Sequence, residues 1–252
     1  MIFIAHQIVE TGVTKSLPGN SITIGAGKQF LVIKKIIMKQ NKCICTAIAF
    51  ILAAGFSHDA FAQAKPKMEM SSSITAAIEL RTNMRKLWED HITWTRNVIC
   101  CLVDNLSGTD QAVKRLLKNQ DDIGNAIKPI YGDDAGNKLT ALLHDHINIS
   151  ADVVKAAKAS DNTALNAANK KWFTNADEIS AFLSKANTNW KLDDMKKMMH
   201  EHLKLTTDEV VARIKRDYDG DIVAYDKVHN EILEMSDMLT DGIVKQFPEK
   251  FK

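Results

Sequence analysis

Two nine-residue stretches decide the fold of this chain: "LLHDHINIS" at 142–150 and "MMHEHLKLT" at 198–206. Each holds two histidines two residues apart, in a chain of 252 residues that has eight histidines. Apolar residues recur around them at intervals of three and four, the spacing of one face of an α-helix. Residues two apart on a helix lie about 200° apart, so only one histidine of each pair can face a core. The apolar stripes select His146 and His202, and they turn His144 and His200 toward water.

The two stretches belong to a longer match at a constant offset in residue number, the step from 142 to 198. Residues 119 and 121–123 ("N-DDI") correspond in the same register to residues 175 and 177–179 ("N-DEI"). Ungapped self-similarity of this kind is the sequence signature of an internal repeat. We therefore expect two copies of a two-helix unit around a pseudo-twofold axis, with a long first and last helix completing the bundle.

Beyond residue 70, glycine and proline are sparse and mostly fall between long stretches rich in Ala, Leu, Lys and Glu. This composition favours helices over a sheet. The sequence thus predicts an all-α bundle of about six helices, at about 74–106, 110–130, 134–158, 162–186, 191–216 and 219–246. "TTDE" at 206–209 fits a helix-capping box, so the fifth helix is expected to break and restart at Thr206.

Residues 38–62 have the organisation of a secretory signal peptide. Lys39 and Lys42 precede an apolar run over 43–56, and "AFA" at 60–62 is a small-x-small cleavage site. The run is shorter than the roughly 20 residues of a bilayer span, so no stable membrane span is expected after cleavage. We expect a periplasmic or secreted protein cleaved near Ala62.

This signal peptide implies the domain organisation of the whole chain. Residues 1–37 would be an upstream mis-start and disordered, although a genuine short N-terminal strand or arm is the alternative. Residues 63–73 would be a flexible mature N-terminus. A single helical-bundle domain would then cover 74–247.

The expected mature chain has nearly balanced charge. Six of the 33 Lys and Arg and two of the 31 Asp and Glu precede Gln63, which leaves 27 basic and 29 acidic residues. The basic residues are spread along the chain, which gives no support to nucleic-acid binding. Cys100 and Cys101 are adjacent and point about 100° apart on a helix, so they cannot bridge each other. We expect one thiol in the core and one near the surface. The sequence does not identify a binding partner, and assembly into a homo-oligomer is one of the alternatives.

The first and last helices also carry one histidine each on an apolar stripe, His91 and His229. Asp226, three residues before His229, can share its face. Imidazole suits zinc, iron and copper, and helical bundles place ligands on facing helices. The leading hypothesis is therefore an exported, non-enzymatic bundle that binds a divalent metal or a small ligand. Its candidate metal ligands are His91, His146, His202, His229 and Asp226.

Two alternatives remain. In the first, each inward histidine is a neutral core residue hydrogen-bonded to a polar neighbour, and the protein is a structural or interaction bundle. In the second, the metal keeps an open coordination position and the protein is a metalloenzyme. The sequence has no phosphate-cradling loop, no Gly-x-Ser-x-Gly and no paired Glu-x-x-His, so no catalytic residue is assigned. Four tryptophans fit either a ligand pocket or ordinary packing: Trp88, Trp94, Trp172 and Trp190.

Four segments carry a resemblance: "LWEDHITWTRNVI" at 87–99, "LLKNQDDIGNAIKPIYG" at 116–132, "WFTNADEISAFLSKAN" at 172–187 and "AYDKVHNEILEMSDMLTDGIVKQFP" at 224–248. With them the chain resembles a family of uncharacterised small bacterial helical-bundle proteins, sometimes labelled glycosyltransferase or acetylglutamate kinase. The resemblance implies histidine at positions 91, 146 and 202, and histidine or glutamate at position 229. Both labels would need a nucleotide-binding α/β fold, which an all-helical sequence does not build.

Overall fold

A computed structural model describes residues 72–251. The predictions for residues 1–37, 38–62 and 63–71 lie outside this range. Six α-helices and a terminal 3-10 turn fill the range: α3 (Ser72–Asp104), α4 (Thr109–Tyr131), α5 (Asp133–Lys158), α6 (Asn162–Ala186), α7 (Leu192–Ile214), α8 (Tyr218–Gln246) and η1 (Pro248–Phe251). No strand occurs within these residues. The predicted all-α fold with six helices is confirmed.

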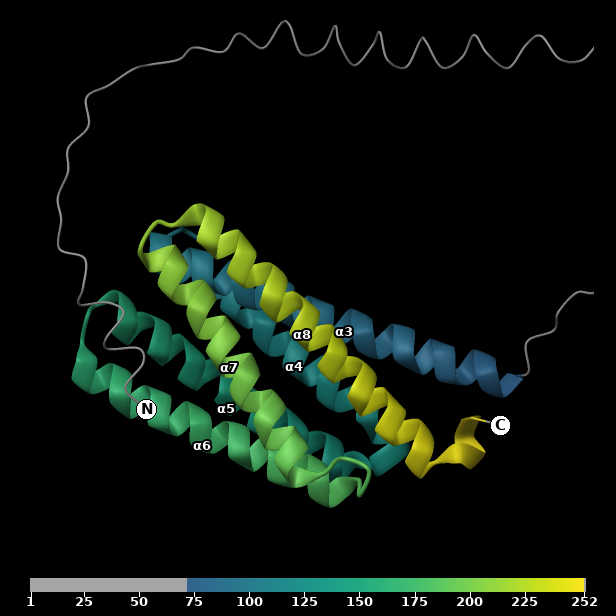
Figure 1. Ribbon diagram of the computed structural model, residues 1–252. Helices are drawn as coiled ribbons and strands as arrows, with labels where there is room; N and C mark the ends of the chain where they lie inside the picture. Colours follow the sequence, from purple (N-terminus) through teal and green to yellow (C-terminus); the bar gives the residue numbers. More distant parts are fainter. Residues whose placement is uncertain (1–71, 252) are drawn as a thin grey trace, which may run out of the picture. The chain divides into compact units, whose positions relative to one another are not determined.

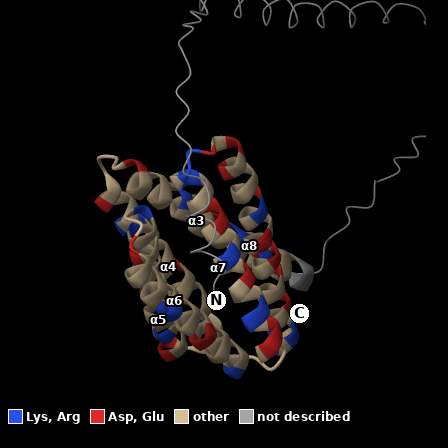
Figure 2. Cartoon of the chain, turned by 60° about the vertical axis from the view of Figure 1, so that its left-hand side comes forward, with Lys and Arg blue, Asp and Glu red and all other residues tan. Residues whose placement is uncertain are grey.

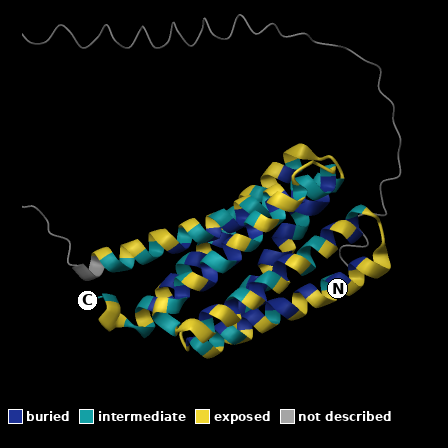
Figure 3. Ribbon diagram, turned by 180° about the vertical axis from the view of Figure 1, so that it is seen from behind, coloured by how far each residue is buried: buried dark blue, intermediate teal, exposed yellow. Residues whose placement is uncertain are grey.

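The helices form a ring. Each one packs against the next in the chain, and α8 packs back against α3 (Figure 1). In addition α3, α5 and α7 contact one another, so the first helix of each successive pair reaches the middle of the bundle. Buried residues line the inward faces and exposed residues the outward ones (Figure 3). Residues far apart in the sequence therefore meet along the bundle axis.

Local chemistry explains several helix boundaries. Gly132 has φ 88° between α4 and α5, a left-handed backbone that glycine adopts without strain. Asp161 and Asp217 cap α6 and α8, and each side chain accepts a hydrogen bond at 3.0 Å, from the backbone N–H of Ala164 and Gly220. Such caps satisfy backbone donors that the first helical turn leaves free.

The predicted break at Thr206 is wrong, because α7 continues through it to Ile214. The Thr207 hydroxyl donates to the Leu203 carbonyl at 2.8 Å inside the helix. Glu209, which would have completed the capping box, turns inward and pairs with Arg96 on α3. The Glu209 carboxylate therefore binds Arg96 on another helix and is not free to cap a new helix start at Thr206.

The backbones of α4 and α5 approach each other closely at two glycines. A Cβ placed on Gly124 would lie 2.7 Å from the carbonyl oxygen of Gly136, and one on Gly136 would lie 2.7 Å from that of Gly124. Both positions need glycine for the backbones to approach this closely. The core contains Met195, Met199 and Met235 among its buried side chains.

The two cysteines differ from the expectation. Cys100 and Cys101 are both free, and both are half-buried. The prediction of one buried and one surface thiol is wrong, because their stretch of α3 presents both side chains to the edge of the packed face rather than to its centre.

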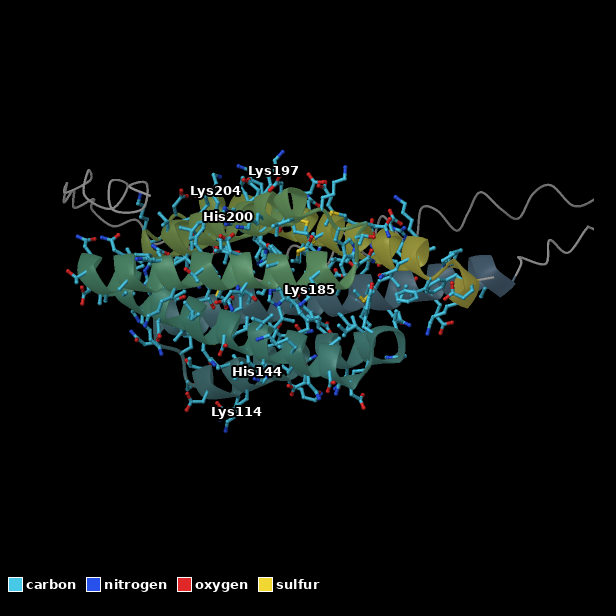
Figure 4. All side chains as sticks on the ribbon, turned by 90° about the horizontal axis from the view of Figure 1, so that it is seen from below. Lys114, His144, Lys185, Lys197, His200 and Lys204 are labelled. Carbon is cyan, nitrogen blue, oxygen red and sulfur yellow. The ribbon has the colours of Figure 1, made fainter. Side chains whose placement is uncertain are left out.

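The outer surface carries mixed charge, with Lys and Arg interspersed with Asp and Glu along the helices (Figure 2). His144 on α5 and His200 on α7 lie on this surface (Figure 4). Each Nε2 lies 2.9 Å from an aspartate 23 residues earlier, Asp121 and Asp177 respectively. The same contact thus recurs at the offset of the sequence match, although the internal repeat as a whole stays a prediction.

No helix in residues 72–251 is long and apolar enough to cross a bilayer.

Candidate metal centre

Three of the predicted ligands meet in the middle of the bundle: His91 on α3, His146 on α5 and His202 on α7. Each is only 3% exposed. The ring centroid of His202 lies 5.9 Å from that of His91 and 6.3 Å from that of His146. The mutual contacts of α3, α5 and α7 bring the rings together. These three residues form what we call the histidine cluster.

Each histidine of the cluster is held through Nδ1 by a polar side chain 29 residues later. The Nδ1 distances are 3.2 Å for His91–Gln120, 2.8 Å for His146–Asn175 and 2.9 Å for His202–Glu231. The spacing is constant because each pair spans one helical hairpin: α3–α4, α5–α6 or α7–α8. We call Gln120, Asn175 and Glu231 the clamp residues. Because they occupy Nδ1, only Nε2 remains for any further partner.

The hydrogen bonds fix the tautomer of His146. The Asn175 Nδ2 amide donates to the Leu142 carbonyl at 3.0 Å, so the Asn175 oxygen faces His146. His146 therefore carries its proton on Nδ1, and its Nε2 lone pair accepts a 3.2 Å hydrogen bond from Trp172 Nε1. Both nitrogens of His146 have a partner, and the indole occupies the one that could bind a metal.

His202 is paired with a carboxylate. The Nδ1–H of His202 donates to Glu231, whose side chain is 12% exposed. A carboxylate in this position fixes the tautomer and the orientation of the ring. No partner of the His202 Nε2 occurs among the hydrogen bonds of residues 72–251. His202 is thus the ring best prepared to donate a lone pair.

His91 has the opposite tautomer. Gln120 Nε2 donates to its Nδ1, so the ring proton lies on Nε2. The two protons of this Gln120 nitrogen are shared among three acceptors, since the Leu116 carbonyl and the Asn119 side-chain oxygen also lie 2.9 Å and 3.0 Å from it. Ligation through Nε2 would require the Gln120 amide to turn, so that its oxygen accepts a hydrogen bond from a protonated Nδ1. In the present arrangement that oxygen has no partner within residues 72–251.

Burial keeps two rings of the cluster, His91 and His146, uncharged. Desolvation, reinforced by His202, lowers the pKa of His146 to about 3. Desolvation and the two neighbouring rings likewise lower the pKa of His91 well below its ordinary value. Both rings are therefore neutral near pH 7, and neutral imidazole is the form that binds metals.

Three buried polar atoms around the cluster lack hydrogen-bond partners in the described part of the chain: Trp88 Nε1, Gln120 Oε1 and Glu231 Oε1. Trp88 meets His91 edge-on, with ring centroids 5.7 Å apart. Leaving such an atom buried and unpaired costs about 1–3 kcal/mol. These atoms could each pair with a further group bound at the cluster.

The remaining predicted ligands lie elsewhere. His229 is half-buried on the outer side of α8, with its Nε2 3.3 Å from Glu89 on α3, and Asp226 is exposed. The prediction that His229 lies on the inward face of α8 is wrong, and Ile222, seven residues earlier on the same face, is 54% exposed. The buried stripe instead runs through Val228 and Ile232, which rotates His229 away from the cluster.

Gln120 and Glu231 were not predicted as site residues from the sequence. Glu231 follows Asn175 at the same offset that relates His202 to His146, so the match that revealed the histidines also points to it. The constant spacing from each inward histidine points to all three clamp residues. This signal was hidden because a lone Gln or Glu on a helix is normally a solvent-facing residue.

A second buried polar group joins α3, α7 and α8. Arg96 donates to Glu209 at 2.6 Å and makes two 2.9 Å hydrogen bonds with Asp221. Arg213 donates to Asp221 Oδ2 at 3.2 Å, the oxygen that also accepts from Arg96 Nη2. Both carboxylates are buried, with Glu209 0% and Asp221 1% exposed. The arrangement ties three helices together and leaves no ring of ligands for a metal.

Within residues 72–251, no group of three or more His, Cys, Asp or Glu side chains is already spaced to hold a metal ion. Ligation by the cluster would therefore require its rings to turn. Comparisons of the chain with protein-family models, curated proteins and solved structures found no match. The resemblance described above accordingly stays a prediction, and functional inference depends on the site itself.

Proposed function

We propose that this protein is a metal-binding helical bundle in which Nε2 of His91, His146 and His202 holds one divalent transition-metal ion. The observation that carries the proposal is the convergence of three buried histidines whose Nδ1 atoms are all held by clamp residues. Metal-ligating histidines ordinarily donate the other ring N–H to a polar group, as His146 and His202 do here through Nδ1, and this fixes the ring for ligation. The unpaired polar atoms around the cluster support the same proposal.

The donor set indicates the class of metal. Three imidazoles suit zinc, copper, iron or nickel better than magnesium or calcium, which prefer oxygen ligands. Three protein ligands also leave a coordination position open, unlike the closed four-ligand sites of structural zinc. The Glu231 carboxylate on His202 would offset part of the metal charge inside the core. The proposed role is binding, and no catalytic residue is assigned.

The signal-peptide pattern in residues 38–62 supports a second part of the proposal, that the bundle acts in the periplasm or outside the cell. The test is the N-terminal sequence of the protein recovered from the exported fraction. A start near Gln63 is expected, and a start at Met1 in the cytoplasmic fraction would contradict it.

A second candidate is a purely structural bundle. It is favoured by one observation, the Trp172 hydrogen bond that leaves His146 with a partner on each nitrogen. In that case the clamp residues only satisfy buried imidazoles, and the histidines determine the register of the three hairpins.

Elemental mass spectrometry separates the two candidates. The full chain, purified without a histidine tag, would be stripped with a chelator, incubated with zinc, iron or copper, and desalted. We expect one metal ion per chain, lost in a His146→Gln/His202→Gln variant. His144→Gln/His200→Gln is the matched control, since it removes two histidines from the same helices but from their outer faces. Absence of metal in the parent protein, or equal loss in both variants, would overturn the proposal.

A further inference from the structure

A cavity of about 40 Å³ lies directly beside the histidine cluster. His91, His146 and His202 form part of its wall, and α3, α4, α5, α6, α7 and α8 all contribute to its lining. An occupant at the cluster end of the cavity would therefore touch the imidazole rings.

The rest of the wall is apolar. It includes Trp88, Leu139, Leu143, Met199 and Leu239. Such a wall offers a water molecule almost none of the two to four polar partners that buried water needs. The cavity is therefore a dry space, suited to an apolar occupant.

Toward the end of the bundle the cavity reaches Tyr131. Its hydroxyl donates to Gln246 at 2.8 Å and accepts from Asn187 at 3.0 Å. Because the hydroxyl already donates one hydrogen bond and accepts another, it has no proton left to donate to a molecule in the cavity. Polar groups that remain in the wall are the imidazoles and the Nε1 donors of Trp88 and Trp190, which have no partner within residues 72–251.

The volume limits the occupant further. The cavity has more room than one water needs, and its volume of about 40 Å³ is well below the roughly 150 Å³ of a cavity that admits benzene. A charged or hydrogen-bonding molecule would lose its hydration without replacement, at a cost of about 2–7 kcal/mol. Acyl chains, sugars and nucleotides are too large. The remaining class is a small apolar molecule of two or three heavy atoms.

We infer that this cavity is a binding site for a small apolar molecule of the size of dioxygen, held against the histidine cluster. The cavity itself needs no metal. The suggestion that the occupant would also meet a bound metal rests on the proposed function, because the same three histidines serve both. The histidine wall would then join the metal and the small molecule in one site.

Xenon is a suitable probe, since it is apolar, of similar size and able to enter dry cavities. Xenon NMR would be recorded on the metal-free full chain in chelator. We expect a saturable shift of the xenon resonance. Leu143→Phe, which fills the cavity, should abolish saturation, whereas Leu143→Ala, which enlarges it, should tighten binding several-fold. Circular dichroism would verify that both variants are folded.

The two variants act in opposite directions at one position, so a failure of either to fold leaves the other decisive. A shift that does not saturate in the parent protein would overturn the inference. Saturation unaffected by either substitution would do so too, because xenon would then bind elsewhere.

A second measurement tests contact with the metal. In protein loaded with copper(II), the relaxation of bound xenon should be faster than in protein loaded with zinc, because a paramagnetic ion would lie next to the cavity. Equal rates in protein with one metal per chain would place the metal away from the xenon site. Xenon binding without metal binding would instead refute only the proposed function.

Discussion

Glu209 should make the bundle less stable as the pH rises toward 8. This carboxylate is fully buried on α7, and its Oε1 accepts a 2.6 Å hydrogen bond from Arg96, while its Oε2 has no partner in residues 72–251. Arg96 is also shared with Asp221. Desolvation outweighs the pull of the guanidinium and raises the pKa of Glu209 to about 7, from 4.5 when exposed. The folded protein therefore holds this proton more tightly than the unfolded chain does.

The sign and size of this change in the free energy of unfolding follow from the linkage between proton binding and folding. A raised pKa in the folded state contributes stability that is complete below the unfolded value and is lost as the pH rises through the folded value. Between pH 5 and pH 8 the loss is about 2 to 3 kcal/mol, since each pKa unit corresponds to about 1.4 kcal/mol. The Glu209→Gln variant keeps an oxygen for Arg96 but does not titrate, so it should lack this loss.

The assay is urea unfolding of the metal-free full chain at pH 5, 6, 7 and 8, followed by circular dichroism. We expect the free energy of unfolding of the parent protein to fall relative to that of Glu209→Gln by about 2 to 3 kcal/mol across this range. Glu201→Gln, which removes an exposed carboxylate from the same helix, should follow the parent protein. Parallel curves for the parent protein and Glu209→Gln would refute the reasoning. A parent protein that gains stability relative to the variant would show that pairing with Arg96 dominates.

Three further outcomes are expected. Gly124→Ala should lower the free energy of unfolding by about 1–3 kcal/mol in urea, because its Cβ would lie 2.7 Å from the Gly136 carbonyl oxygen; an unchanged midpoint would show that the helices can separate. Asp217→Ala should lower it by about 1 kcal/mol through loss of the α8 cap, whereas Asp217→Asn should retain most of the stability. Trp172→Phe should raise metal affinity about tenfold by freeing Nε2 of His146, measured by chelator competition. Weaker binding in that variant would indicate that the indole supports the site instead.

The orientation of the histidines shows which features of the site the sequence could predict and which it could not. For His146 and His202, apolar residues on both sides allow a single inward face, and the structure buries both. For α8, two stripes were available, one through Tyr225 and His229 and one through Val228, and both include Ile232. Helical periodicity cannot choose between stripes so close together on one helix. The choice was made by packing against α3 and α7, which turned His229 toward Glu89.

The sequence by itself determined six helices, their approximate ends and three of the buried histidines, because these depend on local periodicity and on where glycine and proline interrupt it. Only the tertiary structure decided that the three histidines share one cluster and that Gln120, Asn175 and Glu231 hold them. It also decided that α7 continues past Thr206, because Arg96 on another helix takes the Glu209 carboxylate. Such contacts depend on how helices rotate and cross, and this is set by the packing of all six together rather than by any one segment.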